Sequence, residues 1–493
     1  MQRIPVFNPI DNFDNSHIFI EIWLSKHNIM PLIKSISGIR GTIGDSSGDG
    51  LTPADIVKFV TGYGAWLSNR FNNKKLRVVV GRDARMSGKM VNQLVTGTLM
   101  GCGIDILDLG LATTPTVEIA VTEEVADGGI IITASHNPSN WNALKLLNEK
   151  GEFVSDADGK EILSLAEADT FRFAESLEIG EIIFDDSYSD KHIQKILELE
   201  LVDRESILNS RFKIVVDGIN SVGGVVVPQL LKALGVDDII ELNCNPDGNF
   251  SHNPEPIPEN LKEISELVRK ERADLGIVVD PDVDRLALVN EDGSMFGEEY
   301  TLVAVADYVL KKKPGNTVSN LSSTRALSDI SASYGHKHFA SAVGEVNVVE
   351  MMKQKDAIIG GEGNGGVILP DLHYGRDALV GIALFLTHLS KSGLSCSELR
   401  KSYPDYYISK NKLTYSQNQD IDQVIAKIKD RYKSFPINDI DGLKIDFENE
   451  WIHLRKSNTE PIIRIYAEST TLEKASALAH KIIQEISPLL LRQ

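Results

Sequence analysis

The chain has 493 residues, of which 42% are hydrophobic and 25% are charged, a balance typical of folded globular proteins. At about 100–200 residues per domain, this length predicts three or four domains. A formal net charge of −19 argues against nucleic acid and anionic membranes as partners, so an anionic substrate would need basic residues concentrated locally.

Cysteine usage and hydropathy indicate the setting in which the protein works. Cys102, Cys244 and Cys396 lie far apart, are odd in number and form no CxxC pair. This pattern predicts neither a disulfide framework nor a zinc site, and we expect a cytoplasmic protein. No apolar run approaches the about 20 residues that span a bilayer, so we expect no membrane partner.

Residues 1–29 are predicted to be an N-terminal appendage. Their apolar stretch, residues 18–24, is short, contains Glu21 and lacks a preceding basic segment, so it is a poor signal peptide. The first organised segment begins at Met30, which is a candidate for the physiological start.

Residues 30–185 are predicted to form a first α/β domain. Thr52 and Pro53 are typical of a helix N-cap and of the first helical position, and the helix is expected to end at Phe71. A buried strand, a second helix that closes at Gly101 and a further strand follow it. These three elements are expected at residues 76–83, 87–100 and 104–110.

The strand–helix–strand pattern recurs twice, in predicted domains of residues 186–294 and 295–406. The second copy consists of residues 211–218, 222–234 and 239–242, and the third, more diverged copy of residues 317–319, 325–334 and 338–340. A solenoid repeats every 20–50 residues or so, and these copies are much farther apart. They therefore predict successive α/β domains of similar topology.

The last predicted domain, residues 407–493, has a different pattern. Two helices bracket consecutive strands, which predicts a smaller α+β domain. The helices are expected at residues 421–432 and 472–486, and the strands at residues 442–447, 451–454 and 462–467. The predicted fold class is therefore α/β, with three similar α/β domains plus a smaller C-terminal α+β domain.

The stretch from Thr133 to Asn140 follows the apolar run 129–132, which places Ser135 just beyond a predicted buried strand. Open α/β sheets hold their ligands at the carboxyl edge of the strands. Judged alone, Ser135 and His136 are also typical of an ordinary turn, because Ser and Asn hydrogen-bond their own backbone. The stretch is a candidate for catalysis that needs support from the rest of the chain.

Three aspartates, Asp280, Asp282 and Asp284, follow the apolar strand of residues 275–279 at alternate positions. Adjacent carboxylates repel one another unless a cation neutralises them, and all-oxygen ligation with few protein ligands suits Mg²⁺. A solvated acidic turn is the alternative. A calcium-binding EF-hand does not fit, because its glycine and distal glutamate are not at the required spacing.

Residues 360–366 form a glycine-rich stretch after a strand-like segment. Glycines let the backbone approach a ligand closely, and Glu362 and Asn364 offer hydrogen-bonding groups suited to sugar hydroxyls. A flexible turn is the alternative interpretation.

Residues 454–461 concentrate Arg455, Lys456 and three short polar side chains, and Arg464 lies just beyond. A planar guanidinium beside hydroxyls and turn amides is suited to bind a phosphate. A solvated basic turn is the alternative. This segment is the local positive site that an acidic chain would need for an anionic substrate.

Together these four stretches resemble the α-D-phosphohexomutase superfamily, the enzymes that include phosphoglucosamine mutases and phosphomannomutase/phosphoglucomutases. The resemblance covers the chain from about Met30 to its end, with the motifs in the family's order and spacing. It implies four domains around a central cleft, three alike and the fourth different. It also implies an intramolecular phosphotransferase of the isomerase class that acts on a small sugar phosphate, as a monomer or homodimer.

The resemblance further implies roles for individual residues. Ser135 is expected to be the phosphorylated serine, with one Mg²⁺ per chain and a hexose 1,6-bisphosphate as intermediate or activator. The expected metal ligands are Ser135, Asp280, Asp282 and Asp284. The expected substrate-binding residues are Glu362 and Asn364 for the sugar hydroxyls, with Arg455, Ser457, Asn458, Thr459 and Arg464 around the non-reacting phosphate.

Four further residues match family positions around the phosphoserine: His136, Lys145, Arg40 and Arg285. Lys145 is the first candidate for proton transfer and His136 the second. Without the resemblance, Lys145 would be interpreted as a surface lysine and Arg40 as a turn residue.

The sugar-binding stretch departs from the common bacterial pattern, which has a serine and a histidine where this chain has Asn364 and Gly366. Its form looks more like the archaeal branch, whose members act variously on glucosamine, glucose and mannose phosphates. The compact length from Met30 favours a phosphoglucosamine mutase, which in bacteria supplies peptidoglycan precursors. A phosphomannomutase/phosphoglucomutase is the alternative.

Two functions from other classes also fit part of the sequence. A haloacid-dehalogenase-like phosphatase would use Asp280 as nucleophile and Asp282 as acid, but it does not predict the Ser135 stretch or the Arg455 segment. A non-catalytic sugar-phosphate binder would keep the Arg455 segment but predicts no phosphate on Ser135.

Overall fold

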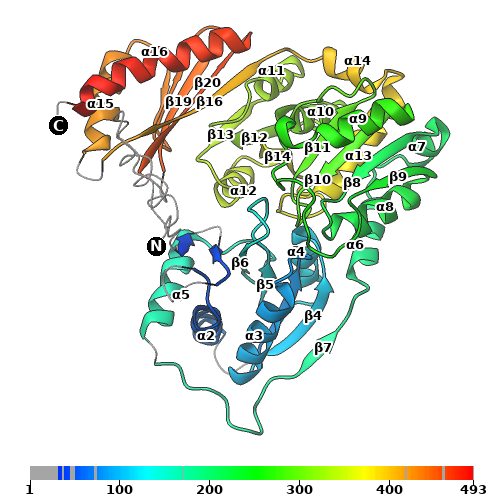
Figure 1. The fold of residues 1–493 in the computed structure, drawn as a ribbon, viewed down its shortest axis with the longest axis vertical. Coiled ribbons are helices and arrows are strands. Elements are labelled where there is room, and N and C mark those ends of the chain that lie inside the picture. Colours follow the sequence, from blue (N-terminus) through cyan, green and yellow to red (C-terminus); the bar gives the residue numbers. More distant parts are fainter. Residues whose placement is uncertain are drawn as a thin grey trace, which may run out of the picture.

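The computed structural model describes residues 32–491 except residues 36–37, 45–49, 72–74, 169, 417–418 and 458–460. The predicted appendage of residues 1–29 and the candidate start at Met30 lie outside the described residues. Four sheets follow one another along the chain, each with its own helices, and we number these units I to IV (Figure 1). Units I to III are α/β and unit IV is an antiparallel sheet with helices, so the predicted fold class is confirmed.

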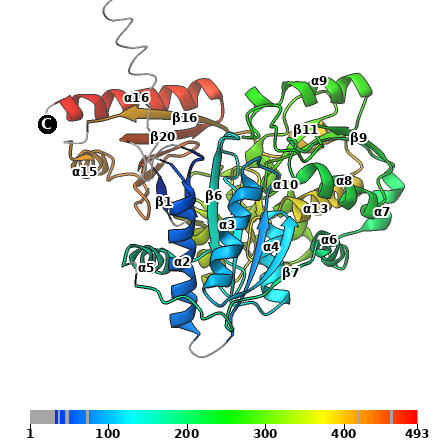
Figure 2. The same ribbon diagram turned by 60° about the horizontal axis from the view of Figure 1, so that its bottom comes forward.

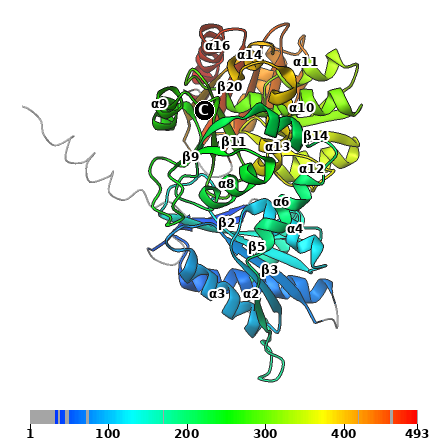
Figure 3. The same ribbon diagram turned by 90° about the vertical axis from the view of Figure 1, so that its right-hand side faces the viewer.

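Unit I contains a seven-stranded sheet with helices on both faces. The strand order is β1-β2-β6-β5-β3-β4-β7. In Figure 3, α2 and α3 lie on one face and α4 on the other, and each face has its own hydrophobic cluster. The elements are β1 (Ile33–Ser35), β2 (Gly38–Thr42), α2 (Pro53–Arg70), β3 (Arg77–Arg82), α3 (Gly88–Gly101), β4 (Asp105–Leu111), α4 (Thr114–Glu123), β5 (Gly128–Ile132), β6 (Trp141–Leu147), α5 (Asp156–Ala168) and β7 (Ile182–Phe184).

The start of α2 confirms the N-cap predicted from Thr52 and Pro53. The backbone N–H of Asp55 donates to the Thr52 hydroxyl, and the Thr52 N–H donates to the Asp55 carboxylate at 3.1 Å. This reciprocal capping box satisfies two backbone donors that a helix start would otherwise leave unpaired. Helix α2 then runs beside α5, along one side of unit I (Figure 2).

Units II and III each contain a four-stranded sheet, in the orders β11-β10-β8-β9 and β13-β12-β14-β15. Unit II contains α6 (Tyr188–Leu197), α7 (Arg204–Ser210), β8 (Lys213–Asp217), α8 (Gly223–Leu234), β9 (Asp238–Leu242), the short 3-10 helix η1 (Pro258–Asn260), α9 (Lys262–Glu271), β10 (Leu275–Val279) and β11 (Leu286–Asn290). Unit III contains α10 (Glu298–Lys312), β12 (Asn316–Asn320), α11 (Ala326–Ser333), β13 (His338–Ser341), α12 (Glu345–Gln354), β14 (Ala357–Glu362), β15 (Gly366–Ile368), α13 (Ala378–Ser392) and α14 (Cys396–Lys401).

The three α/β units repeat one strand arrangement. In each, a first strand (β3, β8 or β12) pairs in parallel with the two strands that follow it, and the third strand (β5, β10 or β14) then turns into an antiparallel fourth (β6, β11 or β15). This confirms the repeats predicted from the sequence. It also means that the loop between the third and fourth strands occupies an equivalent place in all three units.

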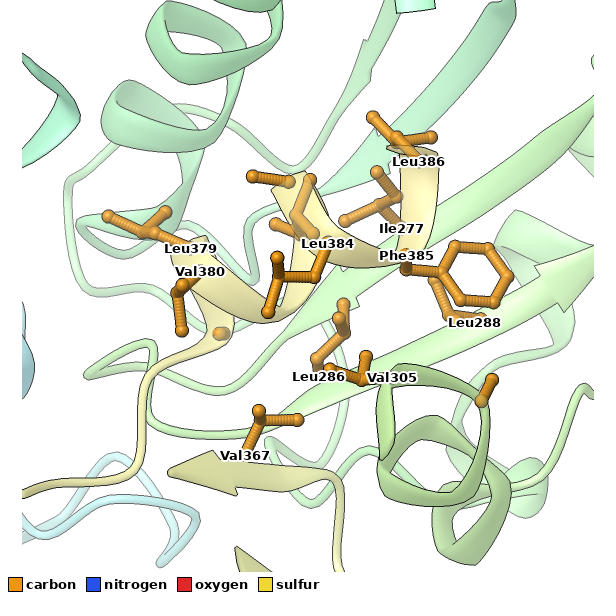
Figure 4. Close-up of a cluster of buried hydrophobic side chains, with 14 of the residues drawn as sticks. Ile277, Leu286, Leu288, Val305, Val367, Leu379, Val380, Leu384, Phe385 and Leu386 are labelled. Carbon is orange, nitrogen blue, oxygen red and sulfur yellow. The ribbon is translucent and has the colours of Figure 1, made fainter. Parts of the chain in front are cut away.

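Units II and III share one hydrophobic core. Helix α13 of unit III contributes Leu384 and Phe385, which pack with Ile277 of β10, Leu288 of β11 and Val305 of α10 (Figure 4). All five side chains are buried. Because one continuous core joins the two units, the loops at the ends of β10 and β14 are held at a defined distance from each other.

Unit IV has a five-stranded antiparallel sheet in the order β16-β20-β19-β18-β17. Helix α16 lies across one face of it (Figure 1). The elements are β16 (Tyr407–Thr414), α15 (Ile421–Arg431), β17 (Ile437–Asn438), β18 (Leu443–Asp446), β19 (Trp451–Lys456), β20 (Ile462–Ser469) and α16 (Leu472–Leu491). The predicted succession of helix, strands and helix is therefore present, and α16 extends five residues beyond its predicted end at Ile486.

Polar contacts attach unit IV to unit III. Lys444 Nζ donates to the Leu321 carbonyl at 3.0 Å, and the Val343 N–H donates to Asp441 Oδ2 at 3.0 Å.

Cys102, Cys244 and Cys396 are all free thiols. Among the described residues, no helix combines the length and the apolar character needed to cross a membrane.

Candidate active site

The three equivalent loops of units I to III open into one cavity of about 630 Å³. They are the loop with Ser135 between β5 and β6, the loop with the three aspartates between β10 and β11, and the loop with Asn364 between β14 and β15. Unit IV contributes further residues to the lining. The predicted residues that line the cavity are Arg40, Ser135, His136, Lys145, Arg285, Glu362, Asn364, Arg455 and Arg464.

The Ser135 hydroxyl lies directly against the aspartate loop. Ser135 Oγ donates to Asp280 Oδ2 at 2.8 Å, although the two residues belong to different units. Ser135 has a φ of 49°, a left-handed conformation that non-glycine residues rarely adopt and that clusters at functional sites. His136 Nδ1 lies 3.5 Å from Ser135 Oγ. Arg285 first, then burial, lowers the pKa of His136 well below its ordinary value.

A buried arginine that the sequence analysis did not single out holds the Ser135 loop in shape. The guanidinium of Arg85 donates to the carbonyls of Ser135, Asn137, Pro138 and Trp141 at distances of 2.5 to 3.1 Å. Its Nε donates to Asp83 Oδ2 at 2.9 Å, and both side chains are fully buried. This arrangement fixes the loop, because another backbone path would leave buried N–H donors of the Arg85 guanidinium without acceptors.

The aspartate loop is also strained and buried. Asp280, Asp282 and Asp284 are inaccessible to solvent, and Val283 between them has a φ of 61°, a genuine outlier for a β-branched residue. The Asp282 backbone and side chain both bind unit I, because its carbonyl accepts from the Thr114 N–H at 2.9 Å and its Oδ2 from the Thr114 hydroxyl at 2.6 Å. Burial and the two neighbouring aspartates raise the pKa of Asp280 well above its ordinary value.

The three aspartates fit a divalent cation with oxygen ligands. One carboxylate oxygen from each lies within 4.8 Å of the others. Within the part of the chain that the structure describes, Asp282 Oδ1 and Asp284 Oδ1 are buried and accept no hydrogen bond. Buried carboxylate oxygens without a partner are costly, and a cation bound between them would supply the missing charge. The donor set is all oxygen, as Mg²⁺ prefers.

Several cations border the aspartate loop on the side of the cavity. Lys145 Nζ donates to Asp282 Oδ2 at 2.6 Å and to Asp284 Oδ2 at 3.3 Å. Burial acts to lower the pKa of Lys145, but these two carboxylates outweigh it and raise the pKa above its ordinary value. Arg285 Nε lies 3.8 Å from Asp284 Oδ1. Arg40, on β2, lines the same part of the cavity.

The glycine-rich stretch of residues 360–366 is not simply a flexible turn. Strand β14 continues through Glu362, so the strand predicted to end near Ile359 is longer than expected. The Asn320 side chain donates to Glu362 Oε1 at 2.8 Å, and Asn364 Oδ1 accepts the Gly366 N–H at 3.2 Å. These contacts hold the Glu362 carboxylate at the cavity wall.

Arg376, which the sequence analysis also missed, joins the loops of units II and III. It lines the cavity and donates to Asp284 Oδ2 at 2.6 Å, to Glu362 Oε2 at 2.8 Å and to Glu345 Oε2 at 3.1 Å. The only signal in the sequence is its place directly before Asp377, which caps α13. A lone arginine before a helix is usually solvated, so this position alone does not predict that Arg376 lies in the cavity.

Unit IV brings Arg455 and Arg464 to the cavity from the adjacent strands β19 and β20. Arg455 NH1 lies 3.2 Å from Asp441 Oδ2, and Ser457 is buried at the end of the strand. The predicted residues Asn458 and Thr459 lie outside the described residues. The cavity of this acidic chain therefore collects cations at both of its ends, beside the aspartate loop and in unit IV.

His453 gives the junction of units III and IV a pH dependence. Its Nδ1 lies 2.9 Å from Ser322 Oγ and its Nε2 lies 2.7 Å from the Asp441 carbonyl, so a neutral ring that donates from Nε2 satisfies both. Burial lowers the pKa of His453 from 6.5 to about 4. Between these two values the unfolded chain takes up a proton that the folded chain does not, so acidification destabilises the fold.

We therefore expect His453→Gln, which keeps one donor and one acceptor, to weaken the acid sensitivity of unfolding. Over a fall from pH 7 to pH 5 the wild type should lose about 2 kcal/mol more stability than the variant. Denaturant titrations at a series of pH values measure this difference. Replacing the exposed His480 with Gln serves as the control. Equal pH profiles for wild type and His453→Gln would contradict the assignment of a neutral buried ring.

Comparison with known proteins identifies the chain. Four family models match it in succession, described as phosphoglucomutase/phosphomannomutase alpha/beta/alpha domains I, II and III and the C-terminal domain. The matched residues are 32–173, 190–293, 297–407 and 411–485. The chain belongs to the phosphoglucomutase/phosphomannomutase family. The predicted membership in the α-D-phosphohexomutase superfamily is confirmed, and the chain is an intramolecular phosphotransferase of the isomerase class.

Relatives in this family have names that differ in substrate. A phosphoglucomutase/phosphomannomutase of Thermococcus kodakarensis is 36% identical over 455 residues, which cover 91% of this chain and 97% of that protein. A probable phosphoglucosamine mutase of Methanopyrus kandleri is 31% identical, covering 91% and 96%. A phosphoglucosamine/phosphogalactosamine mutase of Sulfurisphaera tokodaii is also 31% identical, covering 91% and 97%.

Solved structures of the family share the fold. A phosphoglucomutase/phosphomannomutase family protein of Burkholderia thailandensis superposes with a TM-score of 0.79 at 25% identity, covering 93% of this chain and 96% of that one. An N-acetylphosphoglucosamine mutase of Aspergillus fumigatus, solved with GlcNAc-6P and magnesium, has a TM-score of 0.55 at 16% identity, with the same coverage. The second likeness concerns the fold alone.

Proposed function

We propose that the protein is a phosphoglucosamine mutase, which interconverts glucosamine 6-phosphate and glucosamine 1-phosphate through a phosphoserine at Ser135. The observation that carries this proposal is the contact between Ser135 Oγ and Asp280 Oδ2, across two units, at the wall of the shared cavity. A hydroxyl beside a candidate cation site is suited to carry a phosphoryl group, because the cation and nearby arginines stabilise the charge on the transferring oxygens.

In the proposed cycle, phosphorylated Ser135 transfers its phosphoryl group to the free hydroxyl of the bound sugar monophosphate. This forms a hexose 1,6-bisphosphate and regenerates the Ser135 hydroxyl. The bisphosphate turns around in the cavity and returns its other phosphoryl group to Ser135, so the product is the isomeric monophosphate. Each transfer breaks one O–P bond and forms another, and a covalent carrier divides the isomerisation into two such steps.

Asp280, Asp282 and Asp284 would hold one Mg²⁺ together with the Ser135 phosphate. When bound, Mg²⁺ supplies charge neutralisation for the oxygens of the transferring group. The fit rests on the two buried oxygens described above, Asp282 Oδ1 and Asp284 Oδ1, and on the all-oxygen donor set.

Lys145 and His136 are proposed to handle protons at the reacting hydroxyl. Asp282 and Asp284 hold the Lys145 side chain beside the reacting loop and raise its pKa, so Lys145 is protonated there, although the same carboxylates make its proton harder to release. The lowered pKa of His136 keeps its ring neutral, and its Nδ1, 3.5 Å from Ser135 Oγ, is placed to accept one. We retain Lys145 as the first candidate and His136 as the second.

At the other end of the cavity, Arg455, Ser457 and Arg464, together with Asn458 and Thr459, are proposed to bind the phosphate that does not react. Arg455 and Arg464 stand opposite each other in the pairing of β19 with β20. Glu362 and Asn364 are proposed to contact the sugar hydroxyls between the two phosphate sites. The same contacts must accept the sugar in both orientations, since the intermediate carries a phosphate at each end.

The choice of an amino sugar is supported by a buried carboxyl group beside the glycine-rich loop. Glu299 lines the cavity and lies so close to Gly363 that a Cβ there would meet its Oε2 at 1.8 Å. Burial raises the pKa of Glu299 well above its ordinary value, which favours the neutral acid in the folded chain. The ammonium at C2 of glucosamine phosphate would stabilise the ionised carboxylate. A neutral hydroxyl at the same carbon would not.

Phosphomannomutase/phosphoglucomutase activity is the second candidate, favoured by the name of the Thermococcus kodakarensis relative. We also propose a sugar phosphate as the small-molecule partner, the cytoplasm as the location and a monomer or homodimer as the assembly. A supply of peptidoglycan precursors would follow only in a bacterial source.

A coupled assay that compares glucosamine, glucose and mannose 6-phosphates, with Mg²⁺ present and chelated, tests the function and its substrate. We expect kcat/KM to favour glucosamine 6-phosphate about tenfold and activity to require Mg²⁺. Glu299→Gln should abolish this preference without lowering turnover of glucose 6-phosphate. The control is Glu298→Gln, because Glu298 is the neighbouring acid but already has a cationic partner, Lys410, at 2.6 Å.

The outcomes of this assay separate the two parts of the proposal. A preference for glucose or mannose 6-phosphate would overturn the amino-sugar assignment and favour the second candidate. The absence of turnover with all three substrates would overturn the mutase itself.

A further inference from the structure

We propose that Arg376 is a positioning residue that couples the aspartate loop (residues 280–285) to the glycine-rich sugar loop (residues 360–366). Through Arg376, cation binding at Asp284 and sugar binding at Glu362 affect each other. This inference rests on the proposed function, because it takes Asp284 as a metal ligand and Glu362 as a sugar contact. The coupling goes beyond the assignment of either residue.

Each nitrogen of the Arg376 guanidinium donates to a different carboxylate. NH2 donates to Asp284 at 2.6 Å, NH1 to Glu362 at 2.8 Å and Nε to Glu345 at 3.1 Å. The arginine backbone N–H also donates to Glu345, at 2.8 Å. A planar guanidinium holds its donors in a fixed fork, so a displacement of one carboxylate is transmitted to the other two.

Gly366 leaves the space that this arrangement needs. A Cβ at this position would lie 2.4 Å from Arg376 Cδ and 3.0 Å from its Cγ. The arginine side chain therefore passes over the glycine on its way to Asp284 and Glu362.

The balance of charge sets the direction of the coupling. The Arg376 guanidinium is shared by three buried carboxylates, so they compete for it, although Asp284 also accepts from Lys145 at 3.3 Å. A metal ion at Asp284 competes with Arg376 for the same carboxylate. It would release part of the guanidinium to Glu362, which draws that carboxylate toward the arginine. If Arg376 is replaced, Asp284 loses a positive partner and attracts a metal ion more strongly, whereas Glu362 loses the donor that positions it.

The coupling predicts opposite effects on the two ligands. In Arg376→Met, we expect the dissociation constant of Mn²⁺, used as a probe for Mg²⁺, to fall about tenfold, whereas KM for glucosamine 6-phosphate rises about tenfold. A purely structural defect would weaken both. Arg376→Lys keeps one positive charge but cannot bridge three carboxylates, so it should restore the Mn²⁺ affinity of the wild type while KM stays high.

A second variant covers the case in which Arg376→Met does not fold. Glu345→Gln keeps the arginine but removes one competitor for it, so Arg376 should bind Asp284 more strongly. We therefore expect Glu345→Gln to weaken Mn²⁺ binding about threefold, the reverse of the effect of Arg376→Met. The matched control is Arg400→Lys, because Arg400 pairs with Asp405 at 2.8 Å away from the aspartate loop.

Calorimetric titration with Mn²⁺ and the coupled assay measure these effects. Opposite shifts of Mn²⁺ affinity in Arg376→Met and Glu345→Gln support the coupling. Unchanged Mn²⁺ affinity in both, with wild-type turnover, overturns the coupling but leaves the mutase proposal intact. A wild-type chain that binds no Mn²⁺ overturns both the metal site and the coupling.

Discussion

Replacement of Ser135 by alanine is expected to reduce mutase turnover by about a thousandfold or more, because it removes the group that carries the phosphoryl between the two sugar hydroxyls. Stability should change little, since Ser135 Oγ has only a donor bond to Asp280 and a long contact with His136 Nδ1, and the Arg85 contacts involve only the loop backbone. Steady-state turnover in the coupled assay and the intact mass measure the two consequences. The wild type should carry a single phosphoryl adduct and Ser135→Ala none.

Ser139→Ala, in the same loop, is the matched control and should retain both turnover and the adduct. Retained activity in Ser135→Ala, combined with its loss in an Asp280 variant, would contradict the mutase mechanism. That result would favour the phosphatase with Asp280 as nucleophile. A chain that never acquires the adduct and has no turnover would favour a sugar-phosphate binder.

Asp280→Asn is expected to cost about a thousandfold in turnover without lowering stability in metal-free buffer. Burial and the neighbouring carboxylates raise the pKa of Asp280, so its ionised form is unfavourable in the folded chain. An amide of the same size can still accept the Asp284 and Arg285 N–H groups at Oδ1. The substitution removes one of the three carboxylates that repel one another. Because that carboxylate is also a proposed ligand, the cation site is lost.

Thermal unfolding with and without Mg²⁺ measures whether Asp280→Asn has lost the cation site. A ligand present at a hundred times its dissociation constant stabilises the folded state by about 2.7 kcal/mol, so Mg²⁺ should raise the melting temperature of the wild type but not of Asp280→Asn. Asp371→Asn, at an exposed ion pair with Lys313, is the control. An equal rise in wild type and Asp280→Asn would exclude Asp280 as a ligand.

Much of this architecture could be predicted from local patterns. Apolar runs located β3, β8 and β10, the first two before Gly-containing turns and the third before the aspartates. Thr52 and Pro53 located the start of α2, because periodicity and capping are properties of adjacent residues. The equivalence of the three site loops was harder to see, since it depends on an antiparallel fourth strand whose partner is set by the sheet.

The residues that sequence reasoning missed share one property: their function depends on distant partners. Arg85 stands two residues after Asp83 in what looks like a solvated charged turn, yet its partners lie about 50 residues farther along the chain. Arg376 likewise reaches Asp284, 92 residues earlier. A buried arginine is recognised by the carboxylates and carbonyls around it, and no local pattern reports them.

The hydrogen bonds from Arg85 to four carbonyls also affect how the Ser135 loop accommodates a change of charge. Phosphorylation adds about two negative charges to the serine, and each turnover removes and restores them. The negative ends of four peptide dipoles already terminate on the Arg85 guanidinium. An incoming phosphoryl group therefore does not have to displace these carbonyls. The loop can alternate between charged and uncharged states while its backbone keeps one shape, so reorganisation adds little to the barrier of either transfer.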